Sequence, residues 1–387
     1  MKFQDYYDID VKFQSKSLDL SSGAINFSIH DSIHNFFSNS NIVIQDNTGL
    51  YHESLLNIPG NEFEIFFADP DNRLQSKFIV FESQSNEPKT QGTLNGDIEL
   101  SCIHKYYSQQ KETNFAYKNQ ASKIVENIIN DCKFSYKDIK STNSSIVLYR
   151  MSQTQKDFIN DVVIPNSFSD NCDFTPFYAF IDTENRFNFK NWNEMVSTSP
   201  IENLYYSNVK ISELDKNKIF TIKSFSKNLQ IYSKNINRKL FYRNYSTGEF
   251  FTESSNIFNY PKNRKGYLIP VVKLDTESYS NESIFYNDFV RKETTKARII
   301  NSNKNTMSLE YFEITLPFNS KICSGKTIQL EVSTVDEKSL YNSGIFLVED
   351  CIHTWDGRNR RGFTTIIISR KLVNVPSNYR LRDTIYG

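Results

Sequence analysis

The chain has little glycine, little proline and no net charge. Only 12 of its 387 residues are glycine and 10 are proline, whereas disordered low-complexity chains are usually rich in both. Lysine plus arginine and aspartate plus glutamate number 45 each, so the formal net charge is zero. A free nucleic-acid binder usually carries a basic excess, because contacts to phosphate dominate its affinity. We therefore expect a folded protein without specific affinity for nucleic acid, and one whose weak self-repulsion suits assembly.

The chain also lacks close cysteine pairs and long apolar runs. Its five cysteines, Cys102, Cys132, Cys172, Cys323 and Cys351, lie at least 28 residues apart. We therefore expect free thiols in a reducing cytosol, and neither a disulfide framework nor a zinc site. The first residues hold no apolar signal-peptide core, and no apolar run reaches the roughly 18 residues of a membrane helix. The sequence thus predicts neither a signal peptide nor a membrane span.

Catalytic and metal-binding motifs are missing as well. The chain has no phosphate-binding loop, dinucleotide fingerprint, serine-hydrolase elbow or zinc-hydrolase motif. His30 and His34 have the four-residue spacing of helical metal ligands, but His30 ends a strand-like run and no further ligand completes a site. The D-P-D-N run at 69–72 lacks the glycine and the closing glutamate of a calcium loop and is interpreted as a polar turn. We expect no catalytic residue, no cofactor and no metal.

One pattern in the sequence occurs twice. Each copy is a glycine followed by three strand-like runs: Gly60 with 62–67, 77–82 and 97–104, and Gly325 with 326–332, 344–350 and 364–370. The second run begins at a similar distance from the glycine, since Phe78 follows Gly60 by 18 residues and Ile345 follows Gly325 by 20. Alternating apolar and polar residues are typical of half-buried antiparallel strands. Two copies of one β-unit favour a ring- or tube-forming part over an enzyme with a pocket.

A segment of different character separates the two copies. Residues 118–132 carry apolar side chains at the three-four spacing of an amphipathic helix, and 153–164 predict a second helix that ends at Pro165. The aromatic-rich run 177–190 flanks D-T-E-N and predicts a hairpin with a four-residue turn. Its rings suit either the core or the stacking of bases, and core burial is favoured because few basic residues lie nearby.

The predicted fold class is α+β, mainly β, with two similar antiparallel β-barrel-like tube domains and an α+β segment between them. The predicted boundaries are 1–112 for the first tube domain, 113–205 for the α+β middle domain, 206–249 with 300–372 for a split second tube domain, 250–299 for an insertion and 373–387 for a C-terminal tail. Within the insertion, 284–297 predict a short helix.

The sharpest charge cluster is R-N-R-R at 358–361. Arg358, Arg360 and Arg361 are candidate contacts to a partner or to passing DNA, but a solvated hairpin turn is the favoured interpretation. Trp355 lies beside this loop and is a candidate anchor of a subunit interface, where aromatic residues are enriched. Core packing at the end of a strand is the alternative for Trp355.

The order of these segments resembles a known family. The motifs are G-N-E-F-E-I-F-F, K-F-I-V-F-E, F-Y-A-F-I-D-T-E-N-R-F-N-F, I-T-L-P-F-N-S-K-I-C-S-G-K-T-I-Q-L, G-I-F-L-V-E-D-C-I-H-T-W and R-R-G-F-T-T-I-I-I-S-R. Over most of its length the chain is similar to the baseplate central hub proteins of contractile-tailed, myovirus-type bacteriophages, which are related to the hub domain of type VI secretion spikes.

The resemblance implies a structural, non-enzymatic protein of the virion. It implies a homotrimer in which two tube domains per chain match the sixfold tail tube, while the trimer matches the threefold spike. The implied partners are a central spike protein, a tail tube or tube-initiator protein and baseplate wedge proteins, with phage DNA passing through during genome ejection without specific binding. The implied location is the tail baseplate of this contractile injection system, assembled in the host bacterial cytoplasm. A receptor- or glycan-binding tail adhesin is the alternative, and a wall-lytic enzyme would need a carboxylate pair that no local pattern marks.

Overall fold

The computed structural model describes residues 7–13, 16–18, 25–46, 59–71, 73–85, 96–130, 136–143, 145–167, 176–207, 217–226, 237–244, 250–256, 280–286, 310–333 and 343–370, together with Cys132, Phe134 and Ser169. The predicted tail at 373–387 lies outside these residues. So do 257–279 and 287–299, which make up most of the predicted insertion.

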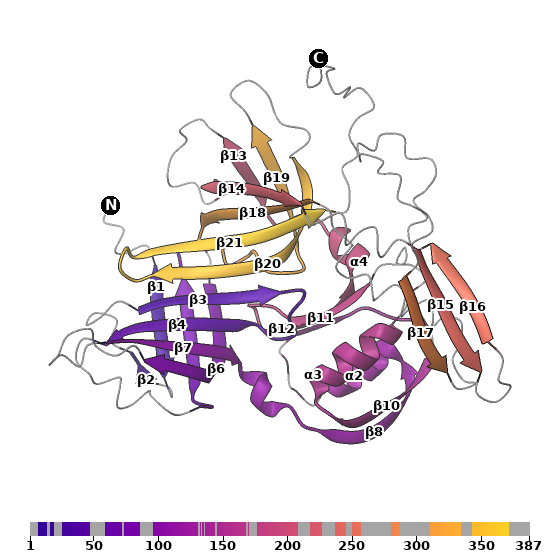
Figure 1. Ribbon diagram of the computed structural model, residues 1–387. Coiled ribbons are helices and arrows are strands. Elements are labelled where there is room, and N and C mark those ends of the chain that lie inside the picture. The colour runs from indigo at the N-terminus through magenta and orange to yellow at the C-terminus, as the bar shows by residue number, and fades with distance from the viewer. Residues whose placement is uncertain are drawn as a thin grey trace, which may run out of the picture.

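One large sheet runs through both ends of the chain (Figure 1). The strand order is β14-β18-β21-β20-β3-β4-β7-β6-β5-β1-β2, while β19 pairs with β20 and β13 with β19. The N-terminal strands are β1 (Asp8–Phe13), β2 (Lys16–Ser17), β3 (Ile25–Ser32), β4 (Asn39–Asp46), β5 (Glu62–Ala68), β6 (Arg73–Ser85) and β7 (Gly96–His104). The later strands are β13 (Asn203–Ser207), β14 (Thr221–Ser226), β18 (Glu310–Pro317), β19 (Thr327–Ser333), β20 (Gly344–Asp356) and β21 (Arg361–Arg370). The α+β, mainly β class is confirmed. Tyr205 of β13 also forms a bridge to Lys218, just before β14, which brings the β13 and β14 ends of the sheet together.

The two ends of the chain build the same three-stranded unit. Strands β5, β6 and β7 pair antiparallel in that order, and β19, β20 and β21 do the same. In each unit the first strand has 7 residues and the second has 13. In each, the long strand shifts register once, between Val80 and Glu82 in β6 and between Val348 and Asp350 in β20. Such bulges bend a strand and increase its twist.

The repeated glycines serve these bulges. Gly60 and Gly325 have φ of +92° and +74°, a conformation that glycine adopts without strain. Their N–H groups donate to the carbonyl oxygens of Val80 (2.9 Å) and Val348 (2.8 Å), beside the shift in register. Phe63 pairs with Phe78 in the first unit, and the equivalent Ile328 pairs with Phe346 in the second. The counterpart of Phe78 is therefore Phe346, one residue after Ile345, which the distance from the glycine had matched to it.

The strands outside these units match as well. Strand β4 pairs with β7 and β3 with β4, just as β18 pairs with β21 and β14 with β18. We call β3–β7 repeat 1, and β14 with β18–β21 repeat 2. The copies differ at one edge, because β1 runs antiparallel to β5 whereas β13 runs parallel to β19. Each repeat encloses its own apolar core.

The α+β segment lies between the repeats in sequence and beside both in space (Figure 1). Its strands are β8 (Thr113–Gln120), β9 (Tyr136–Ile139), β10 (Ser145–Gln153), β11 (Phe177–Ile181) and β12 (Arg186–Asn191). Its helical elements are α2 (Ala121–Asn130), α3 (Gln155–Asp157) with the turns η3 (Phe158–Val163) and η4 (Ile164–Asn166), and α4 (Trp192–Val196), with η2 (Lys105–Gln109) before them. Both predicted helices are confirmed, although the first starts at Ala121 because residues 118–120 belong to β8 and pair with β10. The predicted hairpin is confirmed as β11 and β12.

A separate three-stranded sheet contains β15 (Asn237–Asn244), β16 (Phe250–Asn256) and β17 (Ser280–Tyr286). Strand β15 therefore pairs with strands from the predicted insertion and not with the strands of repeat 2. The helix expected at 284–297 is wrong at its start, since residues 284–286 lie in β17, where parallel pairing with β15 fixes an extended backbone. Its remaining residues lie outside the described part of the chain.

Replacing Leu347 with aspartate should lower the free energy of unfolding by several kcal/mol, because Leu347 is fully buried in β20 and an unpaired carboxylate there loses its hydration. Chemical denaturation of the purified variant measures the loss. The matched control is Ile345→Asp in the same strand, where the side chain is 49% exposed. Equal losses in the two variants would contradict the burial of Leu347.

Candidate functional site at the joint between the two repeats

Repeat 1 and repeat 2 meet edge to edge along β3 and β20. The second half of β20 pairs antiparallel with β3, from Asp350 opposite Ser32 to Trp355 opposite Phe27. The first half of β20 instead pairs with β19 on the same edge. The bulge between Val348 and Asp350 thus marks the place where β20 leaves one neighbour for the other. The two repeats share one continuous sheet as a result (Figure 1).

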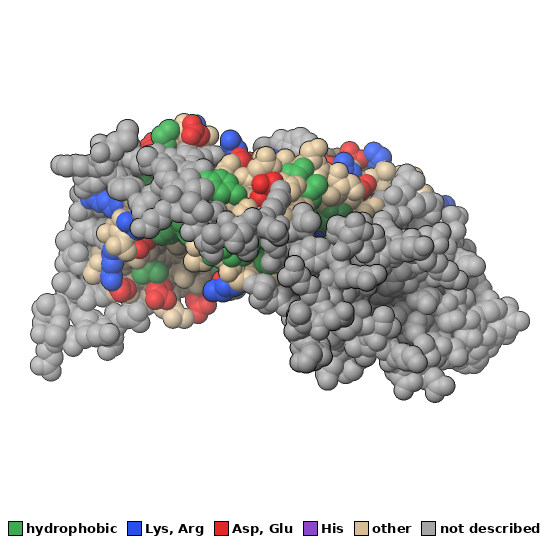
Figure 2. All heavy atoms as spheres, turned by 90° about the horizontal axis from the view of Figure 1, so that it is seen from above, with side chains coloured by type: hydrophobic (Ala, Val, Ile, Leu, Met, Phe, Trp, Pro, Cys, Tyr) green, Lys and Arg blue, Asp and Glu red, His purple; other side chains and the backbone are tan. Residues whose placement is uncertain are grey.

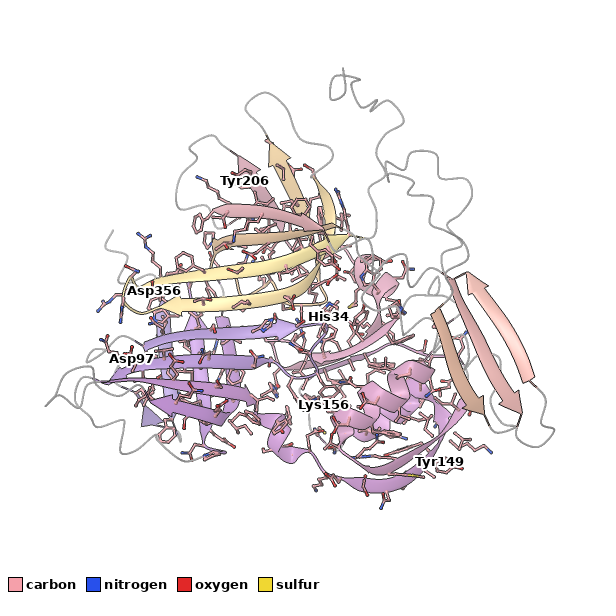
Figure 3. All side chains as sticks on the ribbon, in the orientation of Figure 1. His34, Asp97, Tyr149, Lys156, Tyr206 and Asp356 are labelled. Atoms are coloured by element: carbon pink, nitrogen blue, oxygen red, sulfur yellow. The ribbon has the colours of Figure 1, made fainter. Side chains whose placement is uncertain are left out.

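Histidines and carboxylates reinforce this joint at one end. His34 Nε2 lies 2.9 Å from a carboxylate oxygen of Glu349, and His30 Nε2 lies 3.6 Å from Asp350. Burial raises the pKa of Asp350, but hydrogen bonds from His30 and Ser32 outweigh it and hold this pKa below its ordinary value. Figure 3 shows His34 near the end of β3, facing the α+β segment. These two histidine–carboxylate pairs therefore connect the two repeats at the end of the joint that lies next to the α+β segment.

A buried aspartate ties all three parts together. Asp31 is 1% exposed, and one of its carboxylate oxygens accepts hydrogen bonds from the backbone N–H of Thr183 (3.2 Å) and from the N–H and hydroxyl of Ser324 (3.1 Å each). Asp31 lies in repeat 1, Thr183 in the α+β hairpin and Ser324 in the turn before β19. The other carboxylate oxygen is buried without a hydrogen-bond partner among the described residues. A single side chain thus fixes the relative position of three chain segments.

The hairpin turn at 182–185 is held from several sides. Arg186 Nε donates to the carboxylate of Asp182 at 2.8 Å, and Arg186 Nη2 lies 3.1 Å from the sulfur of Cys323. His104 Nε2 lies 2.8 Å from the side-chain oxygen of Asn185, whose φ of +59° suits asparagine in a tight turn. The turn therefore contacts repeat 1 through β7 and repeat 2 through the loop that holds Cys323.

Burial shifts the pKa values of the ionisable groups at the joint. It raises the pKa of Asp31 to about 7; the nearby charge of Asp182 adds to the shift and the three donors oppose it. Burial also lowers the pKa of His353 to about 4 and raises the pKa of the Cys323 thiol. At neutral pH the Cys323 thiol and the His353 imidazole are therefore uncharged, whereas Asp31 titrates close to neutrality.

Apolar packing fills the space between the joint and the α+β segment. A separate core cluster contains Ile33, Tyr178, Phe180, Trp192, Met195 and Leu347. It combines side chains of repeat 1, of repeat 2 and of the hairpin, so no part completes it alone. Gly325 lies against this cluster, because a Cβ at that position would come within 2.4 Å of the ring of Phe180. Only glycine fits there.

Of the predicted interface residues, Trp355 is the last residue of β20 that pairs with β3, and the three arginines lie beyond this end of the joint. Trp355 is 9% exposed and belongs to the core of repeat 1, with its ring 5.6 Å from that of Tyr7. Arg358, Arg360 and Arg361 are exposed on the turn between β20 and β21. Asp356, at the left-hand end of the hairpin in Figure 3, accepts the N–H of Arg358 and so shapes this turn. An interface role for these four residues stays a prediction.

The described residues contain no group of three or more His, Cys, Asp or Glu that could hold a metal. His30 and His34 lie beside carboxylates, and in D-P-D-N the N–H of Asp71 donates to Asp69 at 2.9 Å, as in a polar turn. Four of the cysteines are free and buried, while Cys172 lies outside the described residues. None of the helices in the described ranges is long and apolar enough to cross a membrane.

Sequence patterns did not reveal the polar network of the joint. One signal was present: Ile25, Phe27 and Ile29 alternate on the buried face of β3, and Asp31 occupies the next position on that face. A carboxylate at a position where alternation demands an apolar residue indicates a specific buried partner. The partners themselves come from segments too distant in sequence for any local pattern to connect.

Asp31→Asn should change how stability depends on pH. Because the pKa of Asp31 is about 7 in the folded chain and about 4 when unfolded, the folded state binds the extra proton between these values. The contribution of Asp31 to stability is therefore full below about pH 4 and falls as pH rises to about 7, by on the order of 4 kcal/mol.

The asparagine variant lacks this loss, so its free energy of unfolding relative to wild type should increase from pH 5 to pH 8. Urea denaturation of both proteins at each pH measures the difference, in which the titration of groups that do not interact with Asp31 cancels. A difference that does not change with pH would contradict the raised pKa.

Comparisons with known proteins agree with this architecture. Neither a protein-family model nor a curated protein sequence matches the chain. The tail protein from Neisseria meningitidis MC58 superposes with a TM-score of 0.58 at 9% identity, covering 96% of this chain and 99% of that one. The 43 kDa tail protein of prophage MuSo2 from Shewanella oneidensis gives 0.57 at 9% identity, with 94% and 98% covered. A component of the Escherichia coli type VI secretion system gives 0.48 at 8% identity, with 95% and 80% covered. The first two likenesses establish that this chain has the fold of phage tail proteins, as the resemblance in sequence predicted.

Proposed function

We propose that this chain is a structural, non-enzymatic hub of a phage tail baseplate. In this proposal it forms a homotrimer that joins the sixfold tail tube to the threefold spike and encloses part of the DNA ejection channel. It is located in the virion tail baseplate and assembles in the host bacterial cytoplasm. The observation that carries the proposal is the presence of two equivalent β-repeats, joined edge to edge within one chain.

The count of parts in the chain suits a symmetry adaptor. Among the described residues, each chain holds two repeats and one α+β segment. A closed threefold assembly would therefore present six similar β-units and three α+β segments. The six units suit a hexagonal tube, and the three segments suit a trimeric spike. A closed ring also satisfies strand edges that would otherwise promote aggregation.

The α+β segment offers a surface for the spike protein. On one face of the ribbon formed by β8 and β10, strand β10 exposes three large apolar side chains: Val147 (50%), Tyr149 (59%) and Met151 (69%). Figure 3 shows Tyr149 at the lower end of the molecule, on the side away from β14 and β18. Exposed apolar patches of this kind mark protein-protein contacts. We assign this face to the spike, and the repeats to the tail tube or tube-initiator protein and the baseplate wedge proteins.

Passage of DNA requires a wall that does not bind phosphate. The chain has no net charge. On the face shown in Figure 2, the coloured acidic and basic side chains are interspersed. Long-range attraction of a polyanion needs an uncompensated basic excess, which the chain as a whole does not have. This balance supports transient passage of DNA without specific binding.

Burial of the aromatic hairpin removes the aromatic-rich strands as a glycan-binding platform and so supports the hub over the adhesin. A sugar-binding site would expose aromatic rings as platforms. The aromatic strands of the hairpin are instead fully buried, with Phe177, Tyr178, Phe180, Phe187 and Phe189 each at most 1% exposed. Their place in the core was the favoured interpretation of the sequence, and it is confirmed.

Native mass spectrometry and light scattering test the proposal. We expect a species of three times the chain mass of 45.2 kDa for the purified protein, or a species of three chains plus the bound spike after addition of the spike partner, because ring closure needs three chains. Electron microscopy of that species should show an annulus with a central pore. A strict monomer in both conditions would contradict the hub assignment, and specific hits on a glycan array without assembly would favour the adhesin.

A further inference from the structure

The joint inside the chain uses one edge from each repeat. Repeat 1 contributes β3, its outermost strand next to β4, and repeat 2 contributes the second half of β20, beyond the bulge. The counterparts of these two edges are β14 and the second half of β6. Among the described strands, β14 itself pairs only with β18, although Lys218 just before it bridges to Tyr205 of β13, and residues 82–85 of β6 pair only with β7. Each chain therefore carries a second, unjoined copy of both halves of its own joint.

The bulges and ladders align the two copies residue by residue. The shifts in register match Glu82 of β6 with Asp350 of β20. For β14 and β3, the neighbouring strands give the match. Thr315 of β18 and Val43 of β4 occupy equivalent positions, and they pair with Thr221 and Asn26 respectively. Thr221 therefore matches Asn26. Residues 224–226 of β14 consequently correspond to residues 29–31 of β3.

The pairing of β20 with β3 in the joint predicts, through this alignment, how β6 would pair with β14. In the joint, Cys351 pairs with Asp31, Ile352 with His30 and His353 with Ile29. The equivalent pairs are Ser83 with Ser226, Gln84 with Phe225, and Ser85 with Ser224. We propose that β14 of one chain pairs antiparallel with the second half of β6 of a second copy in this register. The inference rests on the trimer of the proposed function and specifies which edges join its chains.

Side-chain exposure at equivalent positions supports the pairing independently. Glu349, at the bulge of β20, is 4% exposed, while its counterpart Phe81 in β6 is 58% exposed. Ile25 in β3 is 3% exposed, while its counterpart Phe220, next to β14, is 45% exposed. Both positions are thus covered at the internal joint and uncovered at the free edges.

The uncovered residues are large and apolar, as an interface requires. The ring of Phe81 lies 5.9 Å from that of Tyr107, itself 38% exposed, so two aromatic side chains flank the open edge of β6. An unpaired strand edge with exposed apolar neighbours is a template for pairing with another chain. The structure specifies a second copy of this chain as the partner, because β3 already pairs with the equivalent edge of β20 and β14 is the counterpart of β3.

Pairing of this kind is head to tail, since β14 and β6 are different edges of the same chain. A heterologous contact closes into a ring when the rotation per subunit divides the circle. Three chains would then alternate internal and external joints, and all six β-units would meet their neighbours in the same way. The sixfold character of the ring would follow from backbone pairing.

Cysteine crosslinking tests the register. The variant Ser83→Cys with Ser226→Cys and the variant Gln84→Cys with Phe225→Cys place thiols at directly opposite positions, where Cβ atoms of paired strands lie about 4.5–5.5 Å apart. Adjacent pairs alternate between hydrogen-bonded and non-hydrogen-bonded geometry, so the two variants sample both. Under mild oxidation at least one should run as a covalent trimer on a non-reducing gel, because each chain supplies one thiol to each neighbour.

The control variant is Ser83→Cys with Thr221→Cys. Residue 221 lies five positions further along β14, about 17 Å from the expected partner, and should not crosslink. A trimeric native mass without crosslinking of either matched variant would overturn this pairing and leave the hub assignment intact, whereas a monomeric mass would overturn the hub itself. Equal crosslinking of the control would overturn the register.

Phe81→Ser is expected to weaken assembly without unfolding the chain. Loss of the exposed ring should raise the dissociation constant of the trimer at least tenfold, because a loss of about 1.4 kcal/mol of apolar contact corresponds to a factor of ten. The melting temperature of the monomer should stay unchanged. Phe115→Ser, which removes a 60% exposed phenylalanine on the opposite face of the β8–β10 ribbon from Tyr149, should leave self-assembly unchanged. Full assembly of Phe81→Ser would contradict coverage of β6 by a neighbour.

Discussion

The structure depends on the bulge in β20. Before it, β20 pairs with β19 of its own repeat, and beyond it the same edge pairs with β3 of the other repeat. One extra residue therefore turns the end of one β-unit into the start of the next. The shared sheet, the position of the α+β segment and the separation of the apolar cores all follow from this change of pairing partner along β20.

Buried polar contacts at the joint specify geometry more than they add stability. A carboxylate such as Asp31 loses its hydration on burial, and three hydrogen bonds offset this loss only in part, as its raised pKa shows. Each donor, however, comes from a backbone or hydroxyl position that must be placed within a few tenths of an ångström. Apolar packing alone tolerates small rotations between segments, whereas this network does not.

Local features of the sequence were sufficient to predict the repeats. Alternation in 62–67 and 326–332, each introduced by a glycine, follows from the two-residue period of strands and from the backbone angles of Gly60 and Gly325. The joint was not predictable in this way, because its partners are far apart: His34 and Glu349 are separated by 315 residues. Periodicity assigns a residue to one face of a strand but does not identify the segment that covers this face. For this reason the sequence left two alternatives for Trp355, a subunit interface or the core.

The two bulge glycines differ in what surrounds them. A methyl group at Gly60 would meet no atom within 4 Å, whereas one at Gly325 would overlap the ring of Phe180. Asparagine, which also adopts positive φ, can therefore replace the first glycine but not the second. The second repeat is therefore constrained at its bulge by the ring of Phe180, whereas the first repeat is not constrained in this way. Natural variation among relatives should accordingly accumulate at the first bulge while the second stays invariant.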